Sequence, residues 1–268
     1  MSAAAFALLA LLLVGPVPAV LARASWPLRA PRAAVVLWQA IAVAAVLSAF
    51  SAGISIASRL FVPGPDGRPT TVLGEIDHLG VGLWTAYVIV LGLTLVVGGR
   101  LAVAVIRVAI ATRRRRAHHR MLVDILDVSQ SSGRGPLRVL DVAQPLAYCL
   151  PGVRSRVVVS EGALNSLDPD EVAAVLTHER AHLRARHDLV LEAFTAVHAA
   201  FPRFVRSASA LDAVRLLIEL LADDAAVRAT GPTALARALV ACASGRAPSG
   251  AMAAGGPSTL LRVRRLAG

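Results

Sequence analysis

The chain has 268 residues, of which 56% are hydrophobic, and its formal net charge is +11. A mean hydropathy of +0.64 is too high for an ordinary soluble domain and favours a membrane protein. Every basic residue is arginine, because the chain contains no lysine. Much of this positive charge flanks apolar runs, where membrane topology and anionic lipid explain it, so the composition argues against direct nucleic-acid binding.

Three uncharged runs each reach roughly the 20 residues that a helix needs to cross a hydrocarbon core: 3–22, 33–58 and 79–99. Gly15 and Pro16 interrupt the first run, for which a buried soluble helix is an alternative. No basic residue precedes Arg23, so the first run does not resemble a signal peptide. We therefore expect a retained helix with its N-terminus outside.

The arginines between the first two runs (23–32) and the block 113–116 after the third run place both of these segments in the cytoplasm. The more acidic stretch 59–78 is expected outside. Three crossings then place the rest of the chain in the cytoplasm of a multi-pass plasma-membrane protein. Cys149 and Cys242 fall in this part, so we expect core residues and no disulfide.

A basic helix (113–128) is expected to leave the membrane and to end in the linker SQSSGRGP (129–136). Three short, partly β-branched runs at 137–142, 145–150 and 155–160 predict a small antiparallel sheet. The expected fold is mainly α with a small antiparallel sheet: polytopic membrane helices and a cytoplasmic α+β domain. The expected divisions are a transmembrane region (1–112), a basic helix and linker (113–136), a protease domain (137–235) and a C-terminal tail (236–268).

A helix start is encoded at Asp168-Pro169-Asp170-Glu171, which offers an N-cap acid, a proline at the first helical position and a glutamate three residues after the cap. We expect this helix to run from 169 to 190. A further apolar helix is expected at 189–200, and another from 211 that ends at Gly231.

The first of these helices carries His178-Glu179-Arg180-Ala181-His182. Histidines four residues apart project from one helix face and can share a metal ion. In an H-E-x-x-H arrangement the glutamate does not bind the metal but takes a proton from the water that the metal activates. The H-E-x-x-H pattern fixes only three of five positions, so it also occurs by chance or on a solvated helix face. That is the alternative interpretation.

A catalytic zinc takes three protein ligands, and two residues are candidates for the third. Asp188 has the spacing of another zinc-protease class, but that class needs a glycine where this chain has Ala185. Glu219 is the better candidate, because Glu219 and Asp223 share one face of a later helix and Asp223 could hold the tautomer of a histidine ligand. His187 and His198 are not expected to be ligands; His187, beside Asp188, is expected either to support a ligand from behind or to be solvated.

At these residues the chain resembles the gluzincin-type integral-membrane metallopeptidases, and most closely the β-lactam sensor-transducers and antirepressor-regulating peptidases. The resemblance is carried by PLAYCLPG (145–152), RVVVSEGAL (156–164), the H-E-x-x-H helix and the Glu219-x-x-x-Asp223 pair. It implies zinc bound by His178, His182 and Glu219, with Glu179 as the catalytic base.

The resemblance also implies that substrate pairs as an added strand near 145–150. Direct β-lactam sensing is excluded, because it needs a Ser-x-x-Lys site and the chain has no lysine. Relatives commonly have a further membrane helix, and the basic run LLRVRRLAG at 260–268 is of the kind that precedes one.

These features predict a membrane-embedded zinc metalloendopeptidase that cuts a cytoplasmic or membrane-proximal protein, for which family analogy suggests a transcriptional repressor in a signalling pathway. Its expected partners are this protein substrate and membrane lipid. A quality-control or prenyl-protein-processing membrane protease is the alternative enzyme. A non-enzymatic membrane signalling scaffold is the other alternative, although a structural zinc site needs no base such as Glu179.

Overall fold

The computed structural model describes residues 3–61, 76–128, 136–202, 207–244, 252–253 and 258–267. Most of the loop expected at 59–78 and of the linker expected at 129–136 lies outside these residues. The chain forms two compact units, which are described separately. Unit 1 comprises 1–24, 36–105 and 196–210, and unit 2 comprises 25–35, 106–195 and 211–268.

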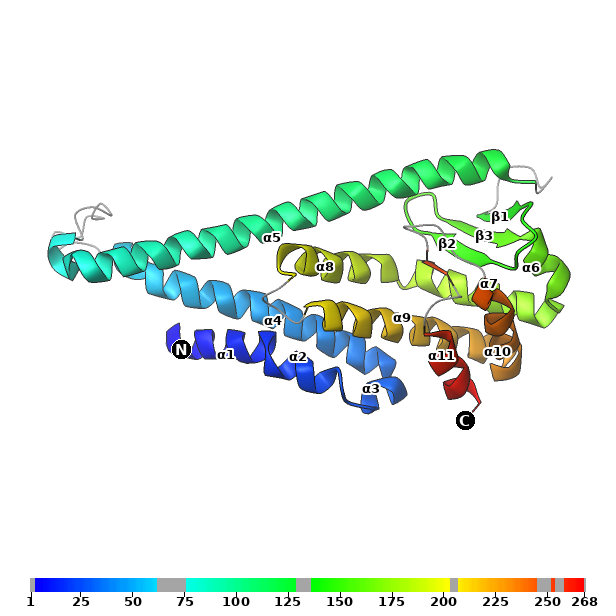
Figure 1. Cartoon of the computed structure of the whole chain (residues 1–268), viewed down its shortest axis with the longest axis horizontal. Coiled ribbons are helices and arrows are strands. Elements are labelled where there is room, and N and C mark those ends of the chain that lie inside the picture. The colour runs from blue at the N-terminus through cyan, green and yellow to red at the C-terminus, as the bar shows by residue number, and fades with distance from the viewer. Residues whose placement is uncertain are drawn as a thin grey trace. The chain divides into compact units, whose positions relative to one another are not determined.

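Figure 1 labels the helices and the strands β1 to β3. The helices are α1 (Ala3–Val14), α2 (Pro16–Leu21), α3 (Trp26–Arg29), α4 (Pro31–Ala57), α5 (Ile76–Leu126), α6 (Glu161–Ser166), α7 (Pro169–Arg184), α8 (His187–Ala200), α9 (Ser207–Thr230), α10 (Pro232–Ala241) and α11 (Thr259–Leu266). The strands are β1 (Leu137–Leu140), β2 (Ala147–Leu150), β3 (Arg156–Ser160) and β4 (Met252–Ala253).

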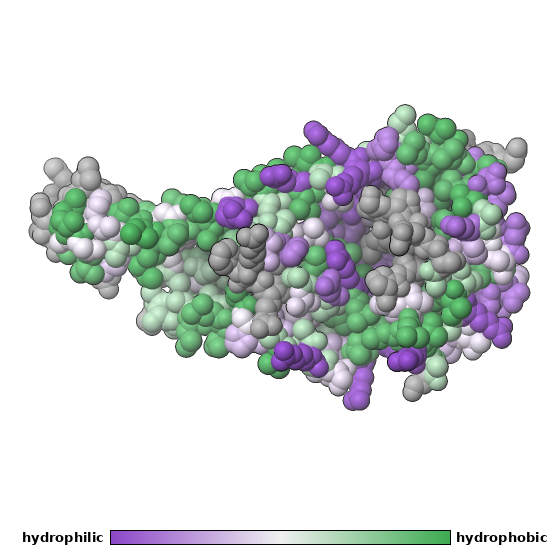
Figure 2. Space-filling model, viewed as in Figure 1, coloured by the Kyte–Doolittle hydropathy of each residue, from purple (hydrophilic) through white to green (hydrophobic). Residues whose placement is uncertain are grey.

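Long apolar helices build unit 1. Three stretches of described helix are long and apolar enough to cross a membrane: Ala3–Leu21, Pro31–Ala57 and Leu79–Leu126. Their outward side chains include Leu11 (71% exposed) and Leu47 (61% exposed), as expected for helices that face lipid. Figure 2 shows apolar side chains over α4 and the first part of α5, at the left of the view. These helices are compatible with a membrane protein.

The third expected span and the expected basic helix are one continuous helix, α5. Two separate elements were predicted here, but no proline interrupts the chain between Gly80 and Leu126. Gly80 has a φ of 72°, which kinks α5 near its start. The first expected span, in contrast, divides into α1 and α2 at Gly15 and Pro16.

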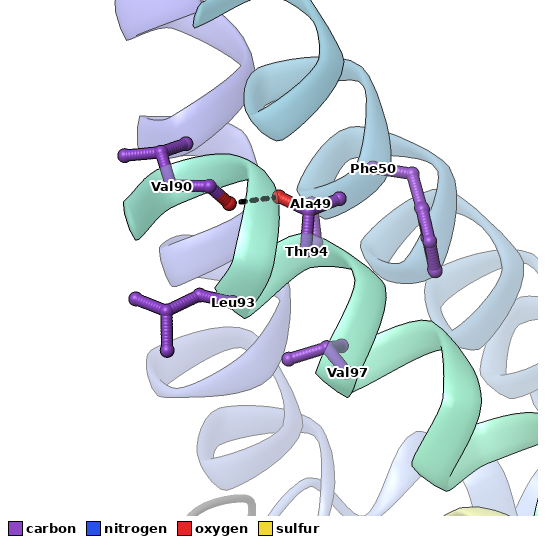
Figure 3. Close-up of a pocket in the computed structure, with 6 residues that line it drawn as sticks. All are labelled: Ala49, Phe50, Val90, Leu93, Thr94 and Val97. Atoms are coloured by element: carbon purple, nitrogen blue, oxygen red, sulfur yellow. Dashed lines mark hydrogen bonds between the residues drawn. The ribbon is translucent and has the colours of Figure 1, made fainter. Parts of the chain in front are cut away.

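Glycines allow α4 and α5 to approach closely. A Cβ on Gly53 would lie 2.1 Å from the Oγ1 of Thr94, and one on Gly98 would lie 2.9 Å from the ring of Phe50. Beside this contact the two helices line a partly open apolar pocket of about 180 Å³, in which Thr94 donates a hydrogen bond to the carbonyl of Val90 (Figure 3). The residues that line it are Ala49, Phe50, Val90, Leu93, Thr94 and Val97.

Unit 2 contains a four-stranded sheet in the order β1-β3-β2-β4. The three expected runs do form strands, but the expected antiparallel sheet is wrong for one pair, because β1 runs parallel to β3. The turn at Gly152 fixes β2 and β3 as antiparallel neighbours. It does not fix on which side β1 joins, and β1 lies beside β3 through pairs such as Val139↔Val159.

Contacts with the end of α5 hold β1 in this position. The carboxylate of Asp127 accepts a hydrogen bond from the Val139 amide at 3.0 Å, and Arg138 donates one to Asp124 at 3.1 Å. Asp124 also accepts one from Arg156 on β3 at 3.0 Å. One carboxylate at the end of α5 therefore contacts both parallel strands.

The sheet packs against helices through a buried apolar core. Figure 1 shows α6 and α7 beside the strands. The core residues come from β2, β3, α6, α7, α9, α10 and the turn after α10: Ala147, Val159, Ala163, Leu167, Ala174, Val175, Ala226, Leu235, Ala238, Leu239 and Cys242. Cys149 and Cys242 are buried and unpaired, as the sequence predicts. This core fixes α7 and α9, the helices that carry the predicted site residues.

Candidate metal centre

The first half of the centre lies on α7. This helix begins with the predicted capping box, in which the Glu171 carboxylate accepts a hydrogen bond from the Asp168 amide at 3.1 Å. Ala174 and Val175 anchor the middle of the helix in the core. Because His178 follows within the next turn, it lies on an anchored segment and is fully buried.

The second half lies on α9, which is held by Ile218 and Leu220, both fully buried. Glu219 and Asp223 lie one turn apart on this helix, as predicted. Asp223 is 1% exposed, whereas the side chain of Glu219 is 18% exposed and so remains within reach of solvent. The helix ends at Gly231, whose φ of 85° suits glycine, as the sequence analysis predicted.

The structure brings His178, His182 and Glu219 together into one group that could hold a metal ion. The Nε2 atoms of the two histidines are 3.1 Å apart. The Glu219 carboxylate lies 3.5 Å from His178 Nε2 and 3.6 Å from His182 Nε2. Ligand atoms about 2.0–2.2 Å from one tetrahedral zinc ion lie roughly 3.3–3.6 Å from one another. Both nitrogen–carboxylate separations fall in this range and the two nitrogens are slightly closer, so the group suits zinc in its chemistry and nearly in its spacing.

Each histidine has a neighbour at its other ring nitrogen. Asp223 Oδ1 lies 3.0 Å from His178 Nδ1, and His187 Nδ1 lies 3.0 Å from His182 Nδ1. A proton on each Nδ1 leaves each Nε2 with a free lone pair, which faces the position that a shared metal ion would take. Asp223 thus occupies its predicted place. His187 lies behind the ring of His182, which is one of the two places that the sequence left open for it; the other was a solvated position.

The position of His187 depends on a break in the helix. The sequence analysis expected one helix from 169 to 190, but α7 ends at Arg184 and α8 begins at His187. Arg186 between them has a φ of 51°, a left-handed conformation that turns the chain. This turn returns His187 to the side of His182 five residues earlier.

Asp188, the alternative third ligand, is not in the group of three. It is 2% exposed, and its carboxylate pairs with Arg116 of α5 at 3.1 Å. Glu192 lies 2.7 Å from the same guanidinium. The structure therefore places Asp188 in an ion pair within unit 2 and leaves Glu219 as the carboxylate that faces the histidines.

Glu179 is fully buried next to this group, and neither of its carboxylate oxygens accepts a hydrogen bond from an N–H or O–H group in the described part of the chain; the thiol of Cys149 is a weak donor beside it. Burial raises its pKa to about 7. Cys149 of β2 is close by: burial and then the Glu179 charge raise the pKa of its thiol well above the ordinary value. An unpaired carboxyl with a pKa near neutrality suits a group that gains and loses a proton.

Arg262 of α11, for which no role was predicted, is 1% exposed. It donates two hydrogen bonds to Asp223, at 2.8 and 2.6 Å, and its Nη1 lies 3.0 Å from Glu219 Oε2. Burial alone would raise the pKa of Asp223, but the hydrogen bonds from Arg262 and His178 lower it to about 2. Only the basic run near the C-terminus hinted at this residue, and it was interpreted as flanking a membrane helix.

The charges of the metal-free site are strongly coupled. Burial lowers the pKa of both histidines. For His178 the hydrogen bonds that its ring donates to Asp223 and Glu219 outweigh burial and raise the pKa to about 9. For His182 burial dominates, and its pKa falls to about 3. The pair therefore holds one proton between its facing nitrogens near neutral pH.

The edge expected to bind substrate is already paired. Tyr148 and Cys149 of β2 pair with Ala253 and Met252 of β4, so β2 has a neighbouring strand on each side. This corrects the expectation of an open edge near 145–150. No strand pattern marks β4 in the sequence, because only two residues of this segment take part.

Comparison with known proteins supplies one match. The family described as Peptidase family M48 matches residues 112–268, which is more than half of the chain. No curated protein and no solved structure matches. The matched region contains every residue of the centre described above.

Proposed function

The chain belongs to peptidase family M48, and on this premise we propose that it is a membrane-embedded zinc metalloendopeptidase. The observation that carries the proposal is the convergence of His178, His182 and Glu219 beside the unpaired carboxylate of Glu179. A scaffold protein gains nothing from a buried carboxylate without an N–H or O–H donor, because its burial costs stability. A peptidase needs such a group to move a proton.

His178, His182 and Glu219 would hold the zinc. When bound, this ion supplies Lewis-acid activation of a water molecule and of the substrate carbonyl. Glu179 accepts a proton from the attacking water on its carboxylate and delivers it to the departing amine. Asp223 and His187 keep the Nδ1 protons in place, so that both Nε2 atoms remain free.

The membrane setting follows the charge pattern. We propose a multi-pass plasma-membrane protein with its N-terminus outside and the matched region in the cytoplasm. This is supported by the three candidate spans and by the arginines that follow the first and third of them. A cysteine in place of the exposed Arg154 tests the orientation: a membrane-impermeant maleimide should label it only after the cells are permeabilised. Labelling of intact cells would overturn it.

The proposed substrate is a cytoplasmic or membrane-proximal protein. The resemblance to antirepressor-regulating peptidases makes a transcriptional repressor the first candidate to test. A quality-control or prenyl-protein-processing role would instead give cleavage of unfolded membrane proteins or of lipidated peptides. The three substrate classes can be compared with the same purified protein in detergent.

Zinc content tests the site directly. Elemental analysis of the full-length protein in detergent should give about one zinc per chain, lost in Glu219→Ala and kept in Asp212→Asn, which changes an exposed acid on the same helix. Asp188→Ala should keep the metal. Glu179→Gln should keep zinc and lose hydrolysis of labelled casein. A wild type without zinc, or an active Glu179→Gln, would refute the proposal and favour the scaffold.

A further inference from the structure

Two arginines of α11 face the metal-ligand helix α9. Arg262 is almost completely buried, and the side chain of Arg265, three residues later and so on a neighbouring part of the same face, is 26% exposed. Arg264 between them is exposed. α11 therefore directs two of its charges to α9 and one to solvent.

Arg262 connects two parts of the metal centre through one guanidinium. Arg262 donates a hydrogen bond to Asp223, which lies beside His178. Its Nη1 lies 3.0 Å from the carboxylate of the ligand Glu219. A planar group that contacts two carboxylates fixes the distance between them more firmly than a single charge would. The placement of Glu219 opposite the histidines thus depends on a residue near the C-terminus.

Arg265 connects the same helix to a distant part of the sequence. Its Nη1 lies 2.7 Å from Asp224 Oδ1, and its Nε donates a hydrogen bond to the carbonyl of Leu28 at 3.0 Å. Leu28 belongs to α3, within the short connection between the candidate spans Ala3–Leu21 and Pro31–Ala57. One side chain therefore joins this connection to the helix that carries Glu219.

Asp223 and Asp224 are consecutive, so the two arginines hold α9 at adjacent points around its circumference. A side-chain terminus about 5–6 Å from a helix axis moves by about 2 Å when the helix rotates by about 20°. Such a shift is more than half of the 3.5 Å that separates Glu219 from His178. A small change in how α11 packs against α9 would therefore change the distance between Glu219 and His178 by a large fraction.

We propose that Arg262 is a positioning residue for the ligand Glu219, and that Arg265 couples the connection containing α3 to this ligand through α11. The inference rests on the metal site proposed above. Displacement of α3 would loosen α11 and weaken the hold on the metal, so the state of the first two membrane helices would regulate the peptidase from within the chain.

Four variants of the full-length protein test the proposal: Arg262→Gln, Arg262→Lys, Arg265→Gln and, as the matched control, Arg264→Gln. The first readout is zinc affinity, measured by competition with a chelator. Arg262→Gln should weaken it about 10- to 100-fold. Arg262→Lys keeps the positive charge but loses the planar guanidinium that contacts two carboxylates. Its zinc affinity should lie between those of Arg262→Gln and wild type. Arg265→Gln should weaken it about fivefold, as expected for a partly exposed ion pair.

The second readout is the visible absorption spectrum of the cobalt-substituted protein, which reports ligand geometry and does not depend on activity. It should change in Arg262→Gln and, to a smaller extent, in Arg265→Gln. The third is hydrogen exchange at the α3 amides, which should quicken in Arg265→Gln but not in Arg264→Gln. Thermal unfolding identifies any variant that fails to fold, and Arg262→Lys, which retains the buried charge, then carries the test.

An Arg262→Lys or Arg262→Gln protein that is folded and has the zinc affinity and cobalt spectrum of wild type would overturn the positioning role. An Arg265→Gln protein that matches Arg264→Gln in all three readouts would overturn the coupling to α3. A wild type that binds no zinc would instead refute the proposed function itself, so the two failures are distinguishable.

Discussion

Replacing Asp223 with alanine should destabilise unit 2 more than any change of an exposed acid on α9. The carboxylate accepts two hydrogen bonds from Arg262 and lies 3.0 Å from His178 Nδ1. Asp223 and Arg262 are each 1% exposed, and His178 is fully buried. The substitution would leave a buried guanidinium without its main partner.

The broken ion pair and the lowered pKa of Asp223 both predict a loss of stability of a few kcal/mol. Removing one member of a buried ion pair costs about 3–5 kcal/mol. A folded-state pKa of about 2, against an ordinary 3.8, corresponds to about 2–3 kcal/mol. Because the folded pKa is the lower one, this stability is present above about pH 4 and is lost as the pH falls toward 2. For a domain of this size the melting temperature should drop by roughly 10 °C near neutral pH.

The assay is thermal unfolding of the full-length protein in detergent after zinc has been removed with a chelator, so that metal loss does not contribute. Asp212→Ala, which removes a carboxylate that is 72% exposed on the same helix, is the control. In an Arg262→Met background the Asp223→Ala change should cost much less, since the pair is already broken. Equal costs in both backgrounds, or an Asp223→Ala protein that melts with the control, would refute the reasoning.

Four other predictions follow from the same structure. Glu179→Gln should raise the melting temperature of the metal-free protein above neutral pH. Because the folded protein raises the pKa of Glu179 from 4.5 to about 7, stability is lost as the pH rises through this interval, and an amide at this position does not ionise. An unchanged melting temperature would contradict the burial of an unpaired charge. His187→Ala should weaken zinc binding about tenfold, with recovery in His187→Asn, whose side chain can still accept a hydrogen bond; chelator competition measures both. Zinc affinity should rise with pH up to about 9, because the proton on His178 competes with the metal, and calorimetry in two buffers should detect about one proton released; a pH-independent affinity would be inconsistent with this. Gly53→Leu should destabilise the packing of α4 against α5 by about 1–3 kcal/mol, whereas Gly92→Leu, where the added side chain meets open space, should not; equal melting temperatures would argue against that helix contact.

Local signals in the sequence determined a large part of the candidate site. The helix start at Asp168 and the helix end at Gly231 both occur as predicted, because caps act within one or two turns of the chain. Histidines four residues apart share a helix face by the geometry of the helix alone, and the same rule relates Glu219 to Asp223. The apolar character of the membrane helices likewise follows from composition and length.

Features that depend on long-range contacts were decided only by the tertiary structure. β1 joins the sheet beside β3 because contacts from the end of α5 hold it there, and no local pattern encodes that choice. The turn at Arg186 brings His187 to His182, although the sequence continues with helix-forming residues. Arg262 meets Asp223 across 39 residues of chain. Spacing relates residues only within one helix or strand, whereas the folding of distant segments onto one core decides which buried charges find each other.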